Sequence, residues 1–181
     1  GHALRQYTAG ERSICGASMP DGMLPYQAFP QPIITPATKA EHGEHDEDIS
    51  PREILHRGIV SEHLWQKLAS ISLELFAYGQ QMASERGLIL ADTKYEFGLI
   101  DGELILIDEI HTPDSSRYFY AEGFDEAVSQ GESPRHLSKE FVREWLMSKG
   151  FQGREGDVMP VMEDEDLQLI CDRYMELYET M

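Results

Sequence analysis

Residues 88–108, LILADTKYEFGLIDGELILID, decide the fold of this chain. Two largely apolar runs, 95–100 and 103–108, flank an Asp-Gly pair at 101–102. An Asp-Gly pair between two such runs is a strong signal for a β-hairpin. A short apolar run at 88–92 precedes the hairpin and predicts a further strand. This stretch therefore predicts antiparallel strands, because a hairpin joins its two strands in opposite directions.

Helical patterns precede the hairpin. Ser50, Pro51 and Glu53 supply an N-cap, a proline at the first helical position and a capping-box glutamate. A longer helix is predicted to begin at Ser61 and to end near Gly87. Its apolar residues recur at spacings of four and three, which is typical of a core helix. This apolar stripe consists of Leu64, Leu68, Ile71, Leu75, Tyr78 and Met82.

Two more helices are predicted after the hairpin. Ser138 caps the first of them, and Gly150 stops it. The second helix ends the chain and has one apolar side. That side consists of Leu167, Ile170, Cys171, Tyr174, Leu177 and Met181. The predicted fold class is therefore α+β, with an antiparallel sheet covered by helices.

The N-terminal part of the chain has a different pattern. Residues 1–50 show little periodicity and are rich in proline, so we predict an extended, turn-rich segment there and an α+β domain at 51–181. Carboxylates and histidines crowd the end of the segment and could form a transition-metal site. A solvated acidic loop has the same composition, and the spacing matches no zinc signature. The candidate ligands are His42, Glu44, His45 and Asp46.

The chain is strongly acidic. Its 15 Lys and Arg against 33 Asp and Glu give a net charge of −18 with histidine counted neutral. This charge repels phosphate backbones and anionic lipids, so we predict neither a nucleic-acid nor a membrane partner. The sequence has no apolar run of about 18 residues and no signal segment, which predicts a cytoplasmic protein. Cys15 and Cys171 lack metal-ligand spacing and are predicted to be reduced thiols.

Ionisable residues gather on and beyond the predicted strands. Because strand side chains alternate, Asp92, Lys94 and Glu96 are predicted to share one face. Asp108 ends the partner strand of the hairpin. Residues 112–117 follow as a predicted loop that carries hydroxyls, a carboxylate and a guanidinium.

The length of the hairpin loop decides how Glu96 and Asp108 are related. A two-residue loop at 101–102 pairs Glu96 with Ile107, whereas a three-residue loop at 101–103 pairs Glu96 with Asp108. We predict the three-residue loop, which places both carboxylates on one face and close enough for one Mg²⁺ to bridge them. The alternative from spacing alone is a solvated hairpin end with ordinary surface ion pairs.

Three blocks of the sequence resemble, in order, the signature blocks of one enzyme family. The blocks are residues 35–50, 88–98 and 107–118. The family is phosphoribosylaminoimidazole-succinocarboxamide synthase, also called SAICAR synthetase, which acts in de novo purine synthesis. The resemblance implies that this chain is the C-terminal domain of a two-domain ATP-cleft enzyme. Residues 1–50 would then contribute to the active-site cleft, and 51–181 would bind nucleotide and substrate.

The resemblance implies an ATP-dependent ligation with ATP and Mg²⁺ as cofactors. Carboxyaminoimidazole ribonucleotide, L-aspartate and ATP would give the succinocarboxamide ribonucleotide, ADP and phosphate by way of an acyl phosphate. Such a reaction depends on positioning and charge neutralisation rather than on an enzyme nucleophile. The implied partners are these small-molecule substrates.

The resemblance also implies roles for individual residues. Lys94 and Asp92 would be catalytic: Lys94 neutralises charge between the substrate carboxylate and the γ-phosphate, and Asp92 orients the aminoimidazole together with Asp114. Glu96 and Asp108 would hold Mg²⁺ on the nucleotide phosphates. Arg117 and Ser115 would take the ribonucleotide phosphate. The remaining expected substrate-binding residues are Lys39, Arg143 and His2.

The sequence departs from the family pattern at two points. His2 stands where the family often has a small hydroxyl residue. The family begins with a β-rich domain whose glycine-rich loop covers ATP, and these 181 residues contain no such domain. The chain is therefore expected to lack this N-terminal domain and to be inactive alone, and a homo-oligomer is compatible with it.

Two other functions fit the same residues. The first is a non-catalytic nucleotide-binding or assembly module that retains the fold. The second is a small-molecule kinase-like phosphotransferase, which shares the carboxylates and Mg²⁺ but needs no amine acceptor. Aspartate-dependent release of phosphate from ATP distinguishes the ligase from the kinase.

Overall fold

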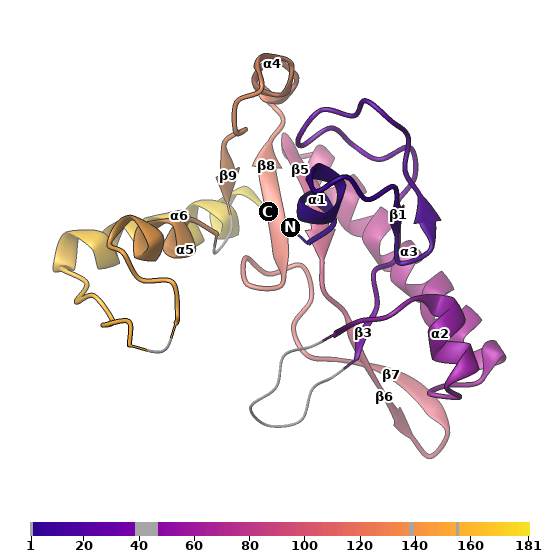
Figure 1. Ribbon diagram of the computed structural model, residues 1–181. Coiled ribbons are helices and arrows are strands. Elements are labelled where there is room, and N and C mark those ends of the chain that lie inside the picture. The colour runs from indigo at the N-terminus through magenta and orange to yellow at the C-terminus, as the bar shows by residue number, and fades with distance from the viewer. Residues whose placement is uncertain (1, 39–46, 138–139, 155) are drawn as a thin grey trace. The chain divides into compact units, whose positions relative to one another are not determined.

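The computed structural model describes residues 2–38, 47–137, 140–154 and 156–181 (Figure 1). Its internal contacts divide the chain into two compact units. The N-terminal unit comprises residues 1–77 and 125–133, and the C-terminal unit comprises 78–124 and 134–181. Neither unit ends at residue 50, where the sequence analysis divides the chain by function, and that functional division stays a prediction.

The N-terminal unit contains short strands and helices. In chain order it holds α1 (His2–Thr8), β1 (Ser13–Ile14), β2 (Ala17–Ser18), β3 (Ala37–Thr38), β4 (Glu47–Asp48), α2 (Pro51–His56), the first part of α3 (Glu62–Ser84) and most of α4 (Phe124–Gln130). Strand β1 pairs with β2, and β3 pairs with β4, both antiparallel. Because residues 2–8 form helix α1, the prediction of an extended segment is wrong there.

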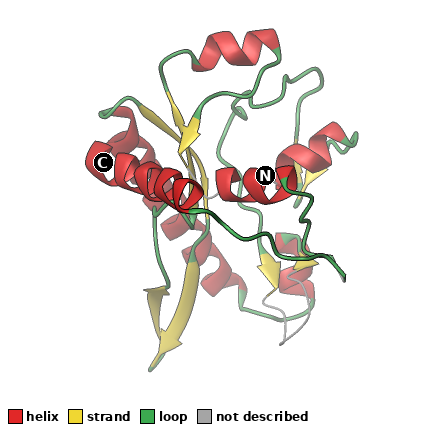
Figure 2. Cartoon of the chain, turned by 90° about the vertical axis from the view of Figure 1, so that its left-hand side faces the viewer, coloured by secondary structure: helices red, strands yellow, loops and turns green. Residues whose placement is uncertain are grey.

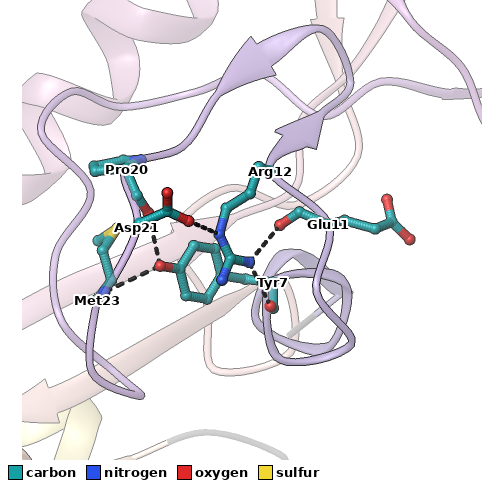
Figure 3. Close-up of polar contacts among 6 residues, drawn as sticks. All are labelled: Tyr7, Glu11, Arg12, Pro20, Asp21 and Met23. Carbon is teal, nitrogen blue, oxygen red and sulfur yellow. Dashed lines mark hydrogen bonds and ion pairs between the residues drawn. The ribbon is translucent and has the colours of Figure 1, made fainter.

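A small core holds the start of this unit together. Tyr7, Ile14 and Met19 are buried in it. The Tyr7 hydroxyl donates to the Pro20 carbonyl at 2.6 Å, and the Arg12 guanidinium lies 4.1 Å from the centre of the Tyr7 ring (Figure 3). Arg12 Nε also lies 2.7 Å from Asp21 Oδ1. Side-chain contacts therefore fix this turn-rich segment where regular secondary structure is sparse.

The N-cap serines and the first-turn proline before the hairpin are confirmed, whereas the Glu53 carboxylate, predicted to complete a capping box, accepts a hydrogen bond from Arg57 Nε at 2.8 Å. Ser50 Oγ accepts from the Glu53 backbone N–H at 3.2 Å, and Pro51 is the first residue of α2. Ser61 Oγ likewise accepts from the backbone N–H of Leu64 at 3.2 Å. Helix α3 then extends to Ser84.

The apolar stripe of α3 is only partly a core stripe. Tyr78, predicted to belong to it, is 61% exposed. The buried residues of α3 are Gly79 and Ala83. These two small residues allow close packing, and the apolar periodicity of the sequence does not indicate that they are buried.

The C-terminal unit carries the hairpin and the main sheet. Its elements are the end of α3, β5 (Leu88–Thr93), β6 (Glu96–Ile100), β7 (Glu103–Ile107), β8 (Ser116–Tyr120), β9 (His136–Leu137), α5 (Glu140–Ser148) and α6 (Asp164–Thr180). Strands β5, β8 and β9 form an antiparallel sheet in that order. Strands β6 and β7 form a separate two-stranded sheet, which projects from the end of the first in both views (Figures 1 and 2).

The core of the C-terminal unit lies on the three-stranded sheet. Leu88, Leu90, Tyr118 and Leu137 are each 1% exposed or less. The central strand β8 was missed by the sequence pattern, which predicted loop as far as Arg117. The run of aromatic residues that follows Arg117 favours a strand and could have revealed β8. Strand β9 and helix α4 were also not predicted.

The last two helices agree with the sequence. Helix α5 ends at Ser148, before Gly150 at φ 84°, whereas its predicted cap Ser138 lies outside the described residues. Helix α6 begins at Asp164 with a capping box between Glu163 and Asp166. Among the described residues, no helix has both the length and the apolar character needed to cross a membrane.

Candidate functional site

The hairpin turn is shorter than predicted. Glu96 pairs with Ile107 and Ile100 pairs with Glu103, so the loop has two residues and the predicted three-residue loop is wrong. Asp101 and Gly102 have φ angles of 51° and 84°. Positive φ at both central residues is typical of the tight turn that Asp-Gly favours, because its twist matches that of the flanking strands.

Glu96 and Asp108 are therefore not cross-strand partners. Asp108 follows the last residue of β7 and has a φ of 67°. At this backbone angle the regular alternation of a strand no longer fixes the face of the side chain. The two carboxylates lie at the same end of the hairpin, at neighbouring rather than directly paired positions.

The carboxylates at this end of the hairpin fit a hard cation, such as Mg²⁺, that binds together with a nucleotide. Within the described residues, no group of three or more His, Cys, Asp or Glu is arranged to hold a metal ion. Mg²⁺ is usually bound by one or two carboxylates together with substrate phosphates, which is what Glu96 and Asp108 can supply. The alternative metal ligands at 42–46 lie outside the described residues.

The prediction that Asp92, Lys94 and Glu96 share one face of a strand is wrong. Strand β5 ends at Thr93 and β6 begins at Glu96, in a different sheet. Lys94 nevertheless meets Glu96, with Nζ 2.5 Å from Oε1. The Glu96 side chain is 19% exposed and that of Lys94 is 61% exposed, so Lys94 is the more accessible of the two side chains.

Asp92 forms a second ion pair, across the sheet. It pairs in register with Arg117 of β8, after a bulge between Leu90 and Asp92. Arg117 Nε donates to Asp92 Oδ1 at 2.9 Å, and Nη2 donates to Oδ2 at 2.5 Å. Arg117, predicted to bind a substrate phosphate, is therefore oriented by a bidentate carboxylate.

The loop before β8 is held by its own hydroxyl groups. The backbone N–H of Thr112 donates to Ser115 Oγ at 3.1 Å, and the N–H of Ser115 donates to Thr112 Oγ1 at 3.2 Å. The N–H of Lys94 donates to the Ser115 carbonyl at 2.9 Å. Asp114 lies exposed in this loop and accepts a hydrogen bond from Tyr174 of α6. These bonds bring Lys94, Asp114 and Ser115 into one local assembly.

His111 anchors the same loop from within. Its φ is 57°, its Nε2 lies 2.6 Å from the Tyr95 hydroxyl, and its carbonyl accepts from the Tyr118 hydroxyl at 2.8 Å. The ring lies against Gly79, where a Cβ atom would be only 2.5 Å from Cε1. Burial lowers the pKa of His111 and raises the pKa of Tyr95 to about 12, so both groups are neutral near pH 7.

These anchoring residues were not predicted. A glycine inside a helix costs about 1 kcal/mol relative to alanine, so Gly79 was the one sequence signal that a close contact exists there. Nothing in the local pattern indicates that His111 is its neighbour, because the two residues are far apart in sequence.

The remaining predicted site residues are Arg143, His2 and Lys39. Arg143 is exposed on α5. His2 is the first residue of α1 in the N-terminal unit, and its side chain is outside the described residues, as is Lys39. The N-terminal unit has a polar cavity of about 250 Å³ beside the described ends of the first signature block. It is lined by Thr38, Glu47, Asp48, Ile49, Ser50, Glu53 and Arg57.

Comparisons with known proteins identify the family. The SAICAR synthetase family model matches residues 2–158. The phosphoribosylaminoimidazole-succinocarboxamide synthase of Bacteroides thetaiotaomicron is 54% identical over 181 residues, covering 100% of this chain and 58% of the relative. The enzyme of the same name from Flavobacterium psychrophilum is 53% identical over 182 residues, again covering 100% of this chain and 58% of the relative. The chain thus spans less than two thirds of these relatives.

Solved structures agree with the sequence relatives. A SAICAR synthase from Saccharomyces cerevisiae complexed with SAICAR has a TM-score of 0.80 at 36% identity, covering 99% of this chain and 56% of that one. A SAICAR synthetase in complex with ADP has a TM-score of 0.58 at 26% identity, covering 83% of this chain and 51% of that one. These matches confirm the predicted α+β fold class and the resemblance on which the site was assigned. The chain belongs to the SAICAR synthetase family.

Proposed function

We propose that this chain forms part of an ATP-dependent ligase that joins L-aspartate to carboxyaminoimidazole ribonucleotide. The products are the succinocarboxamide ribonucleotide, ADP and phosphate, as in de novo purine synthesis. The family membership and the printed names of relatives at 53–54% identity support this reaction. Solved relatives in complex with SAICAR and with ADP support the same product and nucleotide classes.

One observation carries the proposal. The pairing of β5 with β8 joins Asp92 of the second signature block to Arg117 of the third. The backbone N–H of Lys94, bonded to the Ser115 carbonyl, joins the same two blocks a second time. Side chains of both charge signs thereby meet on a rigid framework, which suits a reaction that depends on charge neutralisation.

The ligation proceeds in two substitutions. A carboxylate oxygen of the ribonucleotide attacks the γ-phosphorus of ATP, ADP leaves, and an acyl phosphate forms. The amine of aspartate then attacks the acyl carbon, the amine proton is lost, and phosphate leaves with the bonding electrons. Both steps bring anionic groups together, so cations and fixed geometry lower the barrier.

We assign the chain's residues to these steps as follows. Lys94, exposed beside Glu96, neutralises the charge between the substrate carboxylate and the γ-phosphate. Asp92 and Asp114 accept hydrogen bonds from the aminoimidazole and orient it. Arg117 and Ser115 take the ribonucleotide phosphate. Lys39, Arg143 and His2 contribute further substrate contacts.

Glu96 and Asp108 are the proposed Mg²⁺ ligands. The ion, when bound, would neutralise charge on the nucleotide phosphates. Glu96 is half-buried and already oriented by Lys94, whereas Asp108 is exposed at the strand exit. The two residues approach the nucleotide from neighbouring positions at one end of the hairpin.

We further propose that activity needs an N-terminal β-rich domain with a glycine-rich loop. The curated relatives exceed this chain in length, since it covers 58% of them. In this arrangement residues 1–50 contribute to the active-site cleft and 51–181 bind nucleotide and substrate. Assembly into a homo-oligomer is compatible with the proposal.

The test is ADP release by the full-length protein. ATP and carboxyaminoimidazole ribonucleotide are supplied, with L-aspartate added or omitted, and the succinocarboxamide product is identified by mass. The proposal expects ADP, phosphate and product in equal amounts, and only with aspartate. ADP release without aspartate would instead indicate a phosphotransferase, and nucleotide binding without turnover would indicate a non-catalytic module.

A further inference from the structure

A tyrosine near the end of the chain reaches the proposed substrate site. Tyr174 of α6 donates its hydroxyl hydrogen to Asp114 Oδ1 at 2.6 Å, although the two residues are 60 positions apart. Helix α6 begins at Asp164, beyond residue 158, where the match to the family model ends. The contact therefore joins Asp114, inside the region that the family model matches, to a helix beyond the end of that match.

We propose that Tyr174 is a positioning residue, which acts through Asp114 to set the affinity for the aminoimidazole ribonucleotide. The proposal rests on the proposed function, because it takes Asp114 as the carboxylate that orients the aminoimidazole. Asp114 is exposed in a loop, so its side chain would otherwise sample several rotamers. A fixed donor on a helix restricts it to one orientation before substrate arrives, which lowers the entropy lost on binding.

The Tyr174 ring is itself held in place. It is half-buried and meets Phe141 of α5 edge-on, with ring centres 6.4 Å apart and planes at 68°. The two helices are tied together by the Trp145 indole N–H, which donates to Asp166 Oδ1 at 2.8 Å. The position of the Tyr174 hydroxyl is thus determined by the packing of two helices.

Helix α6 is also attached to the sheet. The Tyr120 hydroxyl of β8 donates to Glu176, and Arg173 lies 3.1 Å from Glu176 on the same helix. Leu177, one turn beyond Tyr174, is buried at 3% exposure. These contacts connect α6 to the strand that carries Arg117, so Tyr174 and the loop of Asp114 share one framework.

The Tyr174 hydroxyl donates a hydrogen bond to Asp114 and keeps its proton. Burial, the hydrogen bond to Asp114 and the charges of Asp114 and Glu109 raise the pKa of Tyr174 to about 12. The hydroxyl therefore stays protonated at neutral pH and remains a donor. A carboxylate that accepts this bond still has further lone pairs, with which it can accept a ring amine or N–H of a substrate.

The experiment compares two single-atom deletions on one helix in the full-length protein. Tyr174→Phe removes the hydroxyl and keeps the ring against Phe141. Tyr178→Phe is the matched control, because Tyr178 is 79% exposed on α6. KM is measured separately for the ribonucleotide, ATP and L-aspartate, together with kcat and Tm.

We expect Tyr174→Phe to raise KM for the ribonucleotide by roughly threefold to tenfold, the effect of one net hydrogen bond. KM for ATP and for aspartate should stay within about twofold of the wild type, and Tyr178→Phe should change none of the three. A merely structural loss would lower kcat and Tm without this selectivity for one substrate. In an Asp114→Ala background, Tyr174→Phe should cause no further rise in KM, because the group through which it acts is absent.

The outcomes separate two kinds of failure. If the wild-type protein does not form the succinocarboxamide product, the proposed function fails. If the wild type turns over but Tyr174→Phe and Tyr178→Phe are alike, the positioning role of Tyr174 is overturned. It is overturned equally if all three KM values rise together, or if Tyr174→Phe has its full effect in the Asp114→Ala background.

Discussion

The substitution Gly79→Ala tests how the loop after β7 is held. A Cβ atom at Gly79 would lie 2.5 Å from Cε1 of His111 and 2.8 Å from Cδ2 of Leu90. Carbon atoms in contact prefer separations of about 3.5–4.0 Å, so the imidazole must move by roughly 1 Å. Leu90 is 1% exposed and packed on all sides, and it gives little room for that movement.

The expected loss of stability follows from three contributions. Overpacking a core contact costs about 1–3 kcal/mol. A displaced His111 ring also loses its hydrogen bond with Tyr95, now 2.6 Å long, which is worth about 1 kcal/mol. Alanine recovers about 1 kcal/mol through its higher helix propensity. The net decrease in the free energy of unfolding is about 1–3 kcal/mol, or roughly 2–12 °C in Tm at this chain length.

Thermal and urea unfolding followed by circular dichroism measure this loss. The matched control is Gly98→Ala, whose Cβ would meet Ile107 at an ordinary 3.7 Å. Gly98→Ala should be neutral or should stabilise by up to about 1 kcal/mol, because alanine narrows the unfolded ensemble. In a His111→Ala background, the cost of Gly79→Ala should fall. Equal Tm values for Gly79→Ala and Gly98→Ala would refute the packing argument.

Four further predictions concern the site and the chain as a whole. Arg117→Lys should weaken ribonucleotide binding by about tenfold to a hundredfold in calorimetric titrations, since lysine cannot form the bidentate bonds; an equal loss of nucleotide affinity would mean that Arg117 acts only by holding Asp92. Glu96→Gln should instead weaken Mg²⁺-dependent nucleotide binding and leave ribonucleotide affinity nearly unchanged, and the reverse pattern in the same titrations would contradict the metal assignment. Burial lowers the pKa of His111, so its contribution to the free energy of unfolding is present above pH about 6.5 and is lost as pH falls. His111→Gln should make the free energy of unfolding, measured in urea, fall less steeply with decreasing pH, and an unchanged pH dependence would exclude His111 as its source. The 181-residue chain alone should bind ATP weakly and form product far more slowly than about 1 s⁻¹, and turnover at that rate would contradict the proposal that activity needs an N-terminal domain.

The sequence alone identified features that neighbouring residues determine. The Asp-Gly pair at 101–102 fixed the hairpin, and Ser50 and Ser61 marked the starts of α2 and α3. Caps and tight turns form between residues a few positions apart, so their chemistry can be read locally. The order of three signature blocks identified the family for the same reason, because it depends on residue identity and not on contacts.

One error could have been avoided with the sequence alone. The two-residue turn follows from the preference of Asp-Gly for positive φ at both positions. The three-residue loop would instead pair Glu96 with Asp108. The register of β6 and β7 shows that the local turn chemistry of Asp-Gly decides the length of the loop.

Tertiary structure alone decided which side chains meet. The pairing of β5 with β8 joins Asp92 to Arg117, and the packing of α6 brings Tyr174 to Asp114. The His111 ring packs against Gly79, which is likewise far from it in sequence. Each of these partners is separated by at least 25 residues, and no local periodicity encodes the choice. Burial of a shared core selects such contacts, because only the assembled sheet and helices bring the partners within reach of one another.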